Sequence, residues 1–165
     1  MDDIIDLELE KVNLIISKIE SDPEDQDVRR VELELWKKIK DMALKGRRTG
    51  LGITAEGDML AALGLRYGSE EAIDFAVEVH KTLAVEAYRA SVMMAKDRGA
   101  FGVFNFEKEQ GNPMVGRILE AAPELRELMQ QYGRRNIAML TIAPTGTTSL
   151  MLQTTSGIEP VFRPV

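Results

Sequence analysis

The residues best suited to chemistry lie late in the sequence, where an apolar run ends at a proline and hydroxyl side chains surround one glycine. They are Pro144, Thr145, Gly146, Thr147, Thr148 and Ser149. Hydroxyl groups donate hydrogen bonds, glycine lets a ligand approach the backbone, and the first N–H groups of a helix attract a phosphate. The pattern therefore indicates a site for a phosphate-sized anion. A strand, a turn and a capped helix also occur together in proteins that bind nothing, so a purely structural interpretation stays open.

Two elements would position this site. Residues 137–142 form an apolar run of strand length, which predicts a buried core strand that Pro144 ends. A helix is predicted to begin near Thr147 and to continue through Leu152, with the preceding hydroxyl groups as its caps.

Helical periodicity dominates the rest of the sequence. It predicts helices over residues 3–20, 28–45, 58–63, 70–98, 113–121 and 123–131. In the second of these helices we expect a buried face formed by Val31, Leu35, Ile39 and Met42, with Leu33 and Trp36 to one side. The aromatic-rich residues 100–106 fit either a short strand or an extended segment.

Two other features are weak candidates for chemistry. Gly50 and Gly52 form a G-x-G pattern, but the third glycine and the preceding strand of a dinucleotide-binding fingerprint are missing. Close packing of the backbone is the better interpretation of these glycines. His80 is the single histidine and has no second ligand at helical spacing, which favours a structural or solvent-facing role over metal binding.

Composition limits the remaining possibilities. A chain of 165 residues with 44% hydrophobic content is large enough for one domain with a real core. A net charge of −6 argues against direct nucleic-acid binding and against an anionic membrane surface. The acidic start and the absence of a long apolar run predict a cytoplasmic protein without a membrane span. The sequence has no cysteine, which excludes disulfides, thiolate metal sites and thiol nucleophiles within it.

Three segments resemble, in their order and spacing, the catalytic chain of ribonucleotide reductase, with the character of the adenosylcobalamin-dependent class II enzymes. They are residues 46–52 together with 58–64, residues 135–149, and residues 156–162. The resemblance extends over essentially the whole chain. It implies an α/β fold, a ten-stranded barrel, of which residues 1–165 would form a single fragment from the later part. Alone, this fragment is expected to be mostly α-helical with a few short strands.

The resemblance also implies a role for the loop that the chemistry singled out. In the family, the segment that matches Pro144, Thr145, Gly146, Thr147 and Thr148 binds the phosphates of the ribonucleotide substrate, and Ser149 is a lesser candidate. Family members use a cofactor-generated thiyl radical on a cysteine and a further cysteine pair as reductant. Because the sequence contains no cysteine, we assign it no catalytic residue and no metal ligand, and we expect the chain alone to be inactive.

Three hypotheses follow. In the first, the chain is part of an oxidoreductase that makes deoxyribonucleotides for DNA replication, and it works with the remaining, cysteine-bearing part; adenosylcobalamin is then implied as cofactor but is not expected to bind this fragment alone. In the second, it is a non-catalytic nucleotide-binding or regulatory module derived from that family. In the third, the loop only caps a helix. The predicted strand at residues 137–142 would lack neighbours in isolation, from which we also expect a homo-oligomer.

Overall fold

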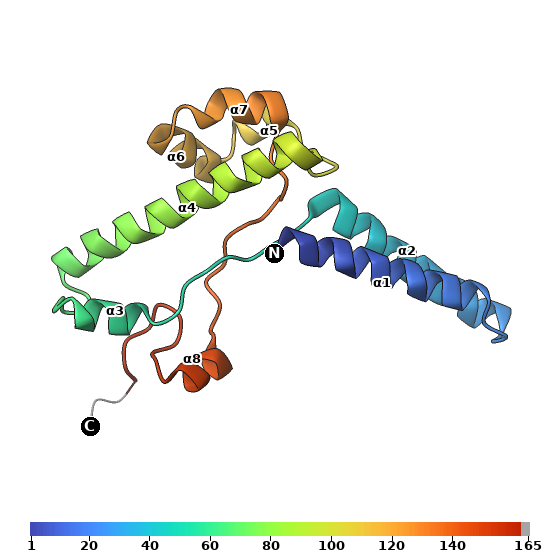
Figure 1. The fold of residues 1–165 in the computed structure, drawn as a ribbon, viewed down its shortest axis with the longest axis horizontal. Coiled ribbons are helices and arrows are strands. Elements are labelled where there is room, and N and C mark those ends of the chain that lie inside the picture. Colours follow the sequence, from blue (N-terminus) through green and yellow to red (C-terminus); the bar gives the residue numbers. More distant parts are fainter. Residues whose placement is uncertain (163–165) are drawn as a thin grey trace. The chain divides into compact units, whose positions relative to one another are not determined.

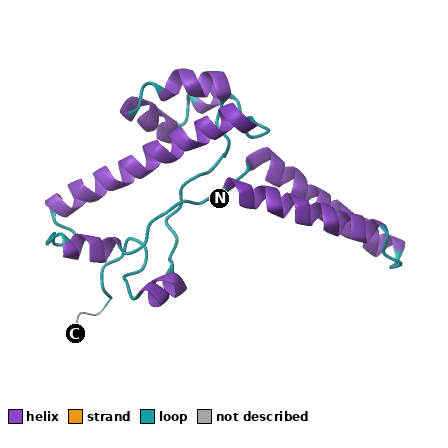
Figure 2. Cartoon of the chain, viewed as in Figure 1, coloured by secondary structure: helices purple, strands orange, loops and turns teal. Residues whose placement is uncertain are grey.

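The structure, a computed structural model, describes residues 1–162 and is built from helices (Figures 1 and 2). In chain order they are α1 (Asp2–Glu20), α2 (Gln26–Gly46), α3 (Glu56–Ala62), α4 (Glu70–Arg98), α5 (Phe106–Glu109), α6 (Pro113–Ala121), α7 (Leu125–Tyr132) and α8 (Gly146–Leu152). The predicted helices are therefore all present, and the long one over residues 70–98 has its predicted ends. Within residues 1–162, no helix combines the length and the apolar character needed to cross a membrane.

The chain divides into two compact units. Unit 1 comprises Met1–Thr49 and Arg89–Met139, and unit 2 comprises Gly50–Tyr88 and Leu140–Val165. Helix α4 contributes its first part to unit 2 and its last part to unit 1. The prediction that residues 1–165 form a single fragment of a barrel stays a prediction.

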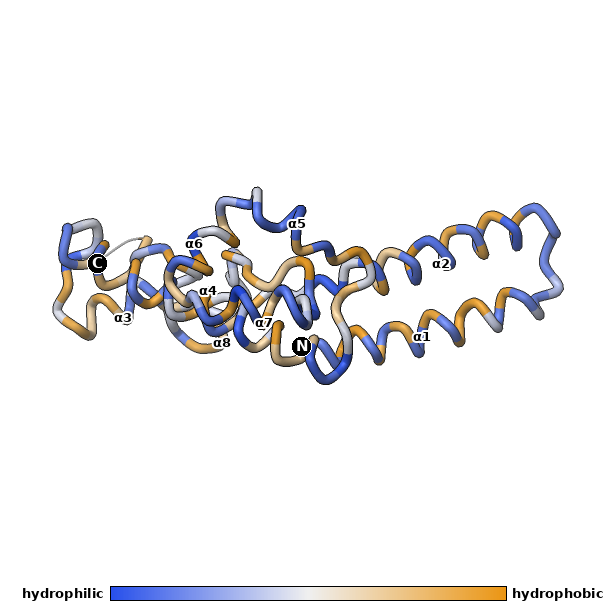
Figure 3. The backbone as a smooth tube through the Cα atoms, turned by 90° about the horizontal axis from the view of Figure 1, so that it is seen from above, coloured by the Kyte–Doolittle hydropathy of each residue, from blue (hydrophilic) through white to orange (hydrophobic). Residues whose placement is uncertain are grey.

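In unit 1, α1 and α2 form a helical hairpin. Ile5, Val12 and Ile19 recur every seven residues on α1 and are buried. Figure 3 shows apolar residues recurring along both helices.

The predicted buried face of α2 is wrong for Val31, Leu35 and Met42, which are 58%, 55% and 58% exposed. The other predicted residues, Leu33, Trp36 and Ile39, are partly buried. Apolar residues therefore lie on more than one side of this helix, and α1 packs against it.

The core of unit 1 joins the last part of α4 to α6 and α7. Val92, Val115, Leu125 and Met129 are almost completely buried there. Asn112 caps α6 through its side chain, and Pro113 occupies the first turn, where a missing N–H costs nothing. Residues 100–106 do not form a strand: they make a turn that leads into the short helix α5.

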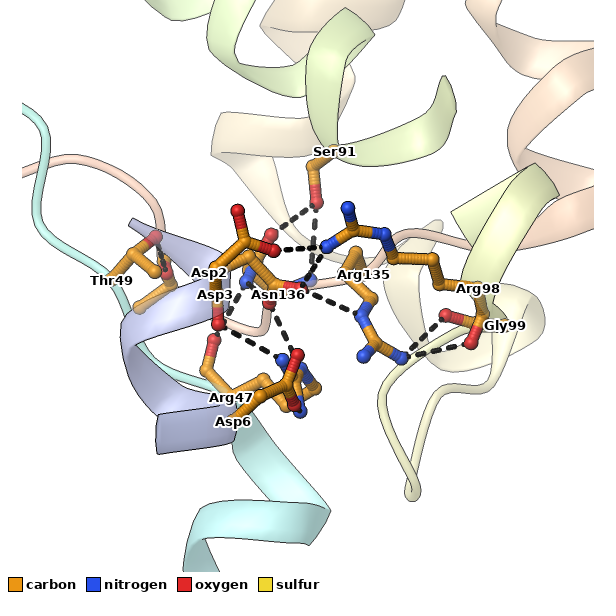
Figure 4. A network of polar contacts seen from close by, with 11 residues as sticks. Asp2, Asp3, Asp6, Arg47, Thr49, Ser91, Arg98, Gly99, Arg135 and Asn136 are labelled. Atoms are coloured by element: carbon orange, nitrogen blue, oxygen red, sulfur yellow. Dashed lines mark hydrogen bonds and ion pairs between the residues drawn. The ribbon is translucent and has the colours of Figure 1, made fainter. Parts of the chain in front are cut away.

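A buried polar network around Asp2 links several segments of unit 1 (Figure 4). The Asp2 carboxylate accepts hydrogen bonds from Arg47 Nε at 2.9 Å, Arg135 Nε at 3.0 Å and Asn136 Nδ2 at 2.9 Å. Burial alone raises the pKa of Asp2, but these bonds outweigh burial and lower it to about 2. Burial lowers the pKa of Arg47, and its bonds to Asp2 and Asp6 more than reverse this effect. Asn136 also accepts a hydrogen bond from Ser91, so α1, α2, α4 and the segment after α7 share one network.

The predicted strand at residues 137–142 is not formed, and the part of the chain that the structure describes contains no strand. A single parallel bridge pairs Leu51 with Leu140, and the Thr141 N–H donates to the Leu51 carbonyl at 2.9 Å. A strand needs a ladder of neighbours to be stable, and one bridge does not supply it. The segment is also less buried than predicted, because Ile142 is 63% exposed. The prediction of a mostly helical chain is confirmed, whereas the few short strands are wrong for residues 1–162.

Candidate functional site

The predicted anion loop lies in unit 2 and turns sharply at Thr145. Thr145 has φ 51° and ψ 27°, the left-handed conformation that is unfavourable for residues other than glycine, asparagine and aspartate. Ala55 and Gln153 are also left-handed, at φ 65° and 57°. Such residues persist where their surroundings fix them, and they gather at binding sites.

The Thr145 hydroxyl holds this turn in place. It accepts a hydrogen bond from the Gly157 N–H at 2.8 Å and shares one with the Thr54 hydroxyl at 2.9 Å. Because the Thr145 hydroxyl is engaged there, it makes no side-chain cap on α8. The prediction that hydroxyl groups cap this helix is therefore wrong for its N-cap residue. The helix also begins one residue before the predicted Thr147, at Gly146.

The loop residues differ in their access to a ligand. Gly146, Thr147 and Thr148 are exposed, and a Cβ built on Gly146 would meet no atom within 4 Å apart from its chain neighbours and the nearby backbone of its own helix. The first N–H groups of an α-helix have no acceptor within the helix, so a ligand can bind them. Pro144 is exposed but has no N–H to donate.

Ser149 lies beneath this surface. It is 3% exposed, and its hydroxyl donates to the Gly146 carbonyl at 2.8 Å and shares a 2.6 Å hydrogen bond with the Ser156 hydroxyl. These bonds tie the first turn of α8 to the segment that follows the helix.

The chain around Gly50 and Gly52 packs closely against Thr141, in the segment that leads into the loop. The glycine pattern predicted such close packing. A Cβ on Gly52 would lie 2.3 Å from the Thr141 carbonyl oxygen, and one on Gly50 would lie 3.0 Å from Thr141 Cγ2. Only glycine therefore lets the chain after Thr49 run this close to the chain that leads into the loop. This packing confirms that the G-x-G pattern here serves backbone approach.

Several residues of this arrangement were not found from the sequence. Asp58 on α3 accepts a hydrogen bond from the Thr155 N–H at 2.8 Å, and the Thr155 hydroxyl accepts one from the Asp58 N–H at 3.2 Å. Thr54 and Gly157 hold Thr145, as described above. These pairs are separated by up to 103 residues, so local pattern cannot reveal them. The signal available from the sequence was the presence of Asp58 and Gly157 in segments that carry the family resemblance.

A hollow of about 550 Å³ lies beside α8. Its lining comprises Asp58, Gly146, Ser149, Leu150, Gln153, Thr154, Thr155, Ser156, Glu159, Pro160, Val161 and Phe162. Asp58 and Glu159 bring carboxylates to this lining, and among its residues within 1–162 none is a lysine or an arginine. The two carboxylates disfavour a phosphate in the part of the hollow next to Asp58 and Glu159.

His80 lies in unit 2 with a buried partner. Its Nε2 is 2.7 Å from Glu56 Oε2, and the Glu56 side chain is 8% exposed. Glu56 also donates its N–H to the Gly157 carbonyl at 3.1 Å. The pair links α4 to α3 and to the segment that holds Thr145, in agreement with the structural role predicted for His80.

Comparison with models of known protein families shows to which family this chain belongs. Residues 28–165 match the model of the ribonucleotide reductase barrel domain. The chain belongs to the ribonucleotide reductase barrel-domain family. The resemblance drawn from the sequence is therefore confirmed at the level of the family.

Relatives within the ribonucleotide reductase family support the same conclusion. A vitamin B12-dependent ribonucleoside-diphosphate reductase of Mycobacterium tuberculosis is 35% identical over 136 residues, which cover 82% of this chain and 17% of that protein. Ribonucleoside-diphosphate reductase alpha subunits of Chlamydia pneumoniae and Helicobacter pylori are 29% and 28% identical over 143 residues each, covering 75% and 77% of this chain. The chain spans 14–18% of the length of these relatives.

Proposed function

We propose that this chain supplies the substrate phosphate-binding loop of a ribonucleotide reductase. In this proposal the N–H groups of Gly146, Thr147 and Thr148 and the hydroxyl groups of the two threonines bind the phosphates of a ribonucleotide. Thr145 and Ser149 do not bind the phosphates through their side chains but hold the loop in shape. Thr145 fixes the turn, and Ser149 fixes the first turn of α8. Pro144 ends the preceding segment.

One observation carries the proposal. The hydroxyl of the N-cap residue Thr145 is held by Thr54 and Gly157, so the loop is fixed while this residue leaves the first N–H groups of the helix without a side-chain cap. An anion-binding site needs both properties, because an ordered loop costs little entropy on binding and an uncapped helix start offers donors. Membership of the reductase family says which anion to expect, namely a ribonucleotide phosphate.

The rest of the reaction would come from outside this sequence. The family's radical chemistry depends on cysteines, and the sequence has none, so this chain would bind and orient the substrate for residues of the remaining part. It would thereby contribute to deoxyribonucleotide synthesis.

Adenosylcobalamin, implied by the B12-dependent relative, would supply the radical in such an enzyme. The described residues next to the loop do not fit this group. The hollow beside α8 measures about 550 Å³, which is a volume for drug-sized ligands, and a corrinoid is much larger. We therefore assign no cobalamin contact to these residues.

Binding measurements on the purified chain test the proposal. Calorimetric titration with a ribonucleoside diphosphate, the triphosphate and the uncharged nucleoside should show binding of the two phosphates and none of the nucleoside. Thr147→Ala and Thr148→Ala should each weaken binding about tenfold, because each removes a hydrogen bond to a charged group. Thr82→Ala, at an exposed position on α4, is the matched control and should change nothing.

A nucleotide that binds equally well to all three variants would contradict the assignment of the loop. Binding without any contribution to reductase activity in a reconstituted enzyme would instead favour a nucleotide-binding or regulatory module derived from the family.

A further inference from the structure

Glu56, the first residue of α3, places a carboxylate in a nearly dry position. Its side chain is 8% exposed, and its Oε2 lies 2.7 Å from His80 Nε2 on α4. A buried carboxylate costs free energy unless hydrogen bonds compensate for the lost water. Within residues 1–162, His80 is the one side chain that bonds to this carboxylate. The position of the Glu56 side chain therefore depends on His80.

The backbone next to Glu56 is strained. Ala55, the N-cap residue of α3, has φ 65° and ψ 28°, a left-handed conformation that is unfavourable for alanine. Such a conformation persists where neighbouring contacts fix it. The Ala55 N–H donates to the Thr155 carbonyl at 3.2 Å, and the Glu56 N–H donates to the Gly157 carbonyl at 3.1 Å. The bond from His80 anchors the side chain of the residue that follows the strained position.

Gly157 connects this start of α3 to the phosphate loop. Its carbonyl accepts from the Glu56 N–H, and its own N–H donates to the Thr145 hydroxyl at 2.8 Å. Thr145 is the N-cap residue of α8. A Cβ on Gly157 would also lie 3.1 Å from the carbonyl oxygen of Ala143, so the glycine is closely packed against the chain that leads into the loop. A movement of Glu56 would therefore be passed through Gly157 to Thr145.

We propose that His80 and Glu56 form a positioning pair for the phosphate loop, an inference that rests on the function proposed for that loop. His80 holds Glu56, the backbone of Glu56 holds Gly157, and Gly157 holds the turn from which α8 begins. All of these residues belong to unit 2. His80 is not among the described residues that line the hollow beside α8, so it acts through other residues and touches no ligand there.

Two consequences separate a positioning pair from a pair that merely joins α3 to α4. Loss of the pair should weaken phosphate binding although no group that touches the phosphate is removed. In return, a phosphate at the loop should be felt at the His80 imidazole, because coupling between two sites is reciprocal. A pair that only stabilised the fold would show neither effect.

Nuclear magnetic resonance of the unmodified chain tests the second consequence. The sequence contains a single histidine, so the imidazole nitrogen signals report on His80 alone. Titration with inorganic phosphate should shift these signals together with the backbone amides of Gly146 and Gly157. If the Gly146 amide shifts while the other two signals stay in place, the loop binds phosphate but the positioning pair is refuted. If the Gly146 amide does not shift, the function proposed for the loop fails instead.

Three variants test the first consequence. His80→Ala should weaken binding of a ribonucleoside diphosphate about tenfold, because it removes a hydrogen bond to a charged group. His80→Gln should restore the affinity of the unmodified chain, since its amide can donate to Glu56. Lys81→Ala is the matched control: Lys81 is the next residue on α4, is exposed and pairs with Glu78. Equal affinities of the alanine variant and the unmodified chain, or no rescue by glutamine, would overturn the inference.

Hydrogen exchange of the Gly157 amide provides a readout that needs no ligand. This N–H bonds to the Thr145 hydroxyl, so its exchange should become about tenfold faster in His80→Ala and should stay unchanged in His80→Gln and Lys81→Ala. Helical circular dichroism shows whether each variant is folded, and the phosphate titration of the unmodified chain decides the matter if His80→Ala does not fold. Unchanged exchange in a folded His80→Ala variant would overturn the positioning role even if the loop binds no nucleotide.

Discussion

At the start of α1, the Asp2 carboxylate receives hydrogen bonds from Arg47, Arg135 and Asn136. The side chains of Asp2 and Arg47 are only 3% and 4% exposed, so neither charge is solvated by water. Arg47 also has a left-handed backbone, at φ 44°, directly after the last residue of α2. Its ion pairs with Asp2 and Asp6 explain why an arginine occupies a position where glycine would cost less.

Asp2→Asn should destabilise unit 1 by about 3 kcal/mol, because it leaves two arginines with less compensating charge in a buried site. Denaturant unfolding at neutral pH measures the effect. The control is Asp3→Asn, whose side chain is 76% exposed and should contribute less than about 1 kcal/mol. If the two changes lowered the free energy of unfolding equally, burial would not be the reason for the contribution of Asp2.

The same carboxylate predicts how stability depends on pH. The pKa of Asp2 is about 2 in the folded chain and near 4 when unfolded, so the folded state binds this proton less readily. Its contribution is complete above about pH 4 and is lost as the pH falls through 2. The stability difference between the unmodified chain and Asp2→Asn should therefore shrink between pH 4 and pH 2, and a constant difference would contradict the lowered pKa.

At the scale of elements, local patterns located the helices and failed for the strand. The helix at residues 70–98 begins after Ser69, whose side chain accepts from the Ala72 N–H, and Gly99 follows its last residue, so its ends were readable from the sequence. The apolar run at residues 137–142 has the composition of a strand, but a strand depends on distant partners. The described residues offer it one bridge, from Leu51, and separate backbone hydrogen bonds with Gly46 and Thr49, which do not form a continuous ladder.

The loop was predictable in position but not in geometry. Its glycine and hydroxyl residues indicated an anion site, and the family resemblance indicated its ligand. The bonds of Thr145 to Thr54 and Gly157 join distant parts of the sequence and reverse the expected capping role. The buried face of α2 was predicted only in part, because apolar residues lie on two sides of this helix: Leu33, Trp36 and Ile39 are partly buried, whereas Val31, Leu35 and Met42 are exposed.

Gly52→Ala should weaken the packing that supports the loop. The new Cβ would meet the Thr141 carbonyl oxygen at 2.3 Å, and the resulting shift should cost about 2 kcal/mol in denaturant unfolding. Gly116→Ala is the control, because Gly116 lies within α6 and a Cβ there meets nothing within 4 Å. That change should stabilise the chain by about 0.5–1 kcal/mol. A neutral result for Gly52→Ala would show that the two segments are not closely packed.

At the scale of the whole molecule, this chain belongs to the ribonucleotide reductase barrel-domain family and spans 14–18% of the length of its relatives. The chain alone should form no deoxynucleotide from any ribonucleotide, because it has no cysteine. Activity should appear when it is combined with a cysteine-bearing remainder of a reductase, adenosylcobalamin and a dithiol reductant. If the parts neither associate nor produce a deoxynucleotide, the proposal of a shared enzyme fails.

The most direct test of the phosphate loop is a nuclear magnetic resonance titration of the ¹⁵N-labelled chain with a ribonucleoside diphosphate. The backbone amide signals of Gly146, Thr147 and Thr148 should shift most, and inorganic phosphate should shift the same signals at higher concentration. The exposed Thr82 on α4 should not respond. If these three signals stay in place while the nucleotide binds elsewhere, or if no signal moves at all, the chain does not supply the phosphate-binding loop.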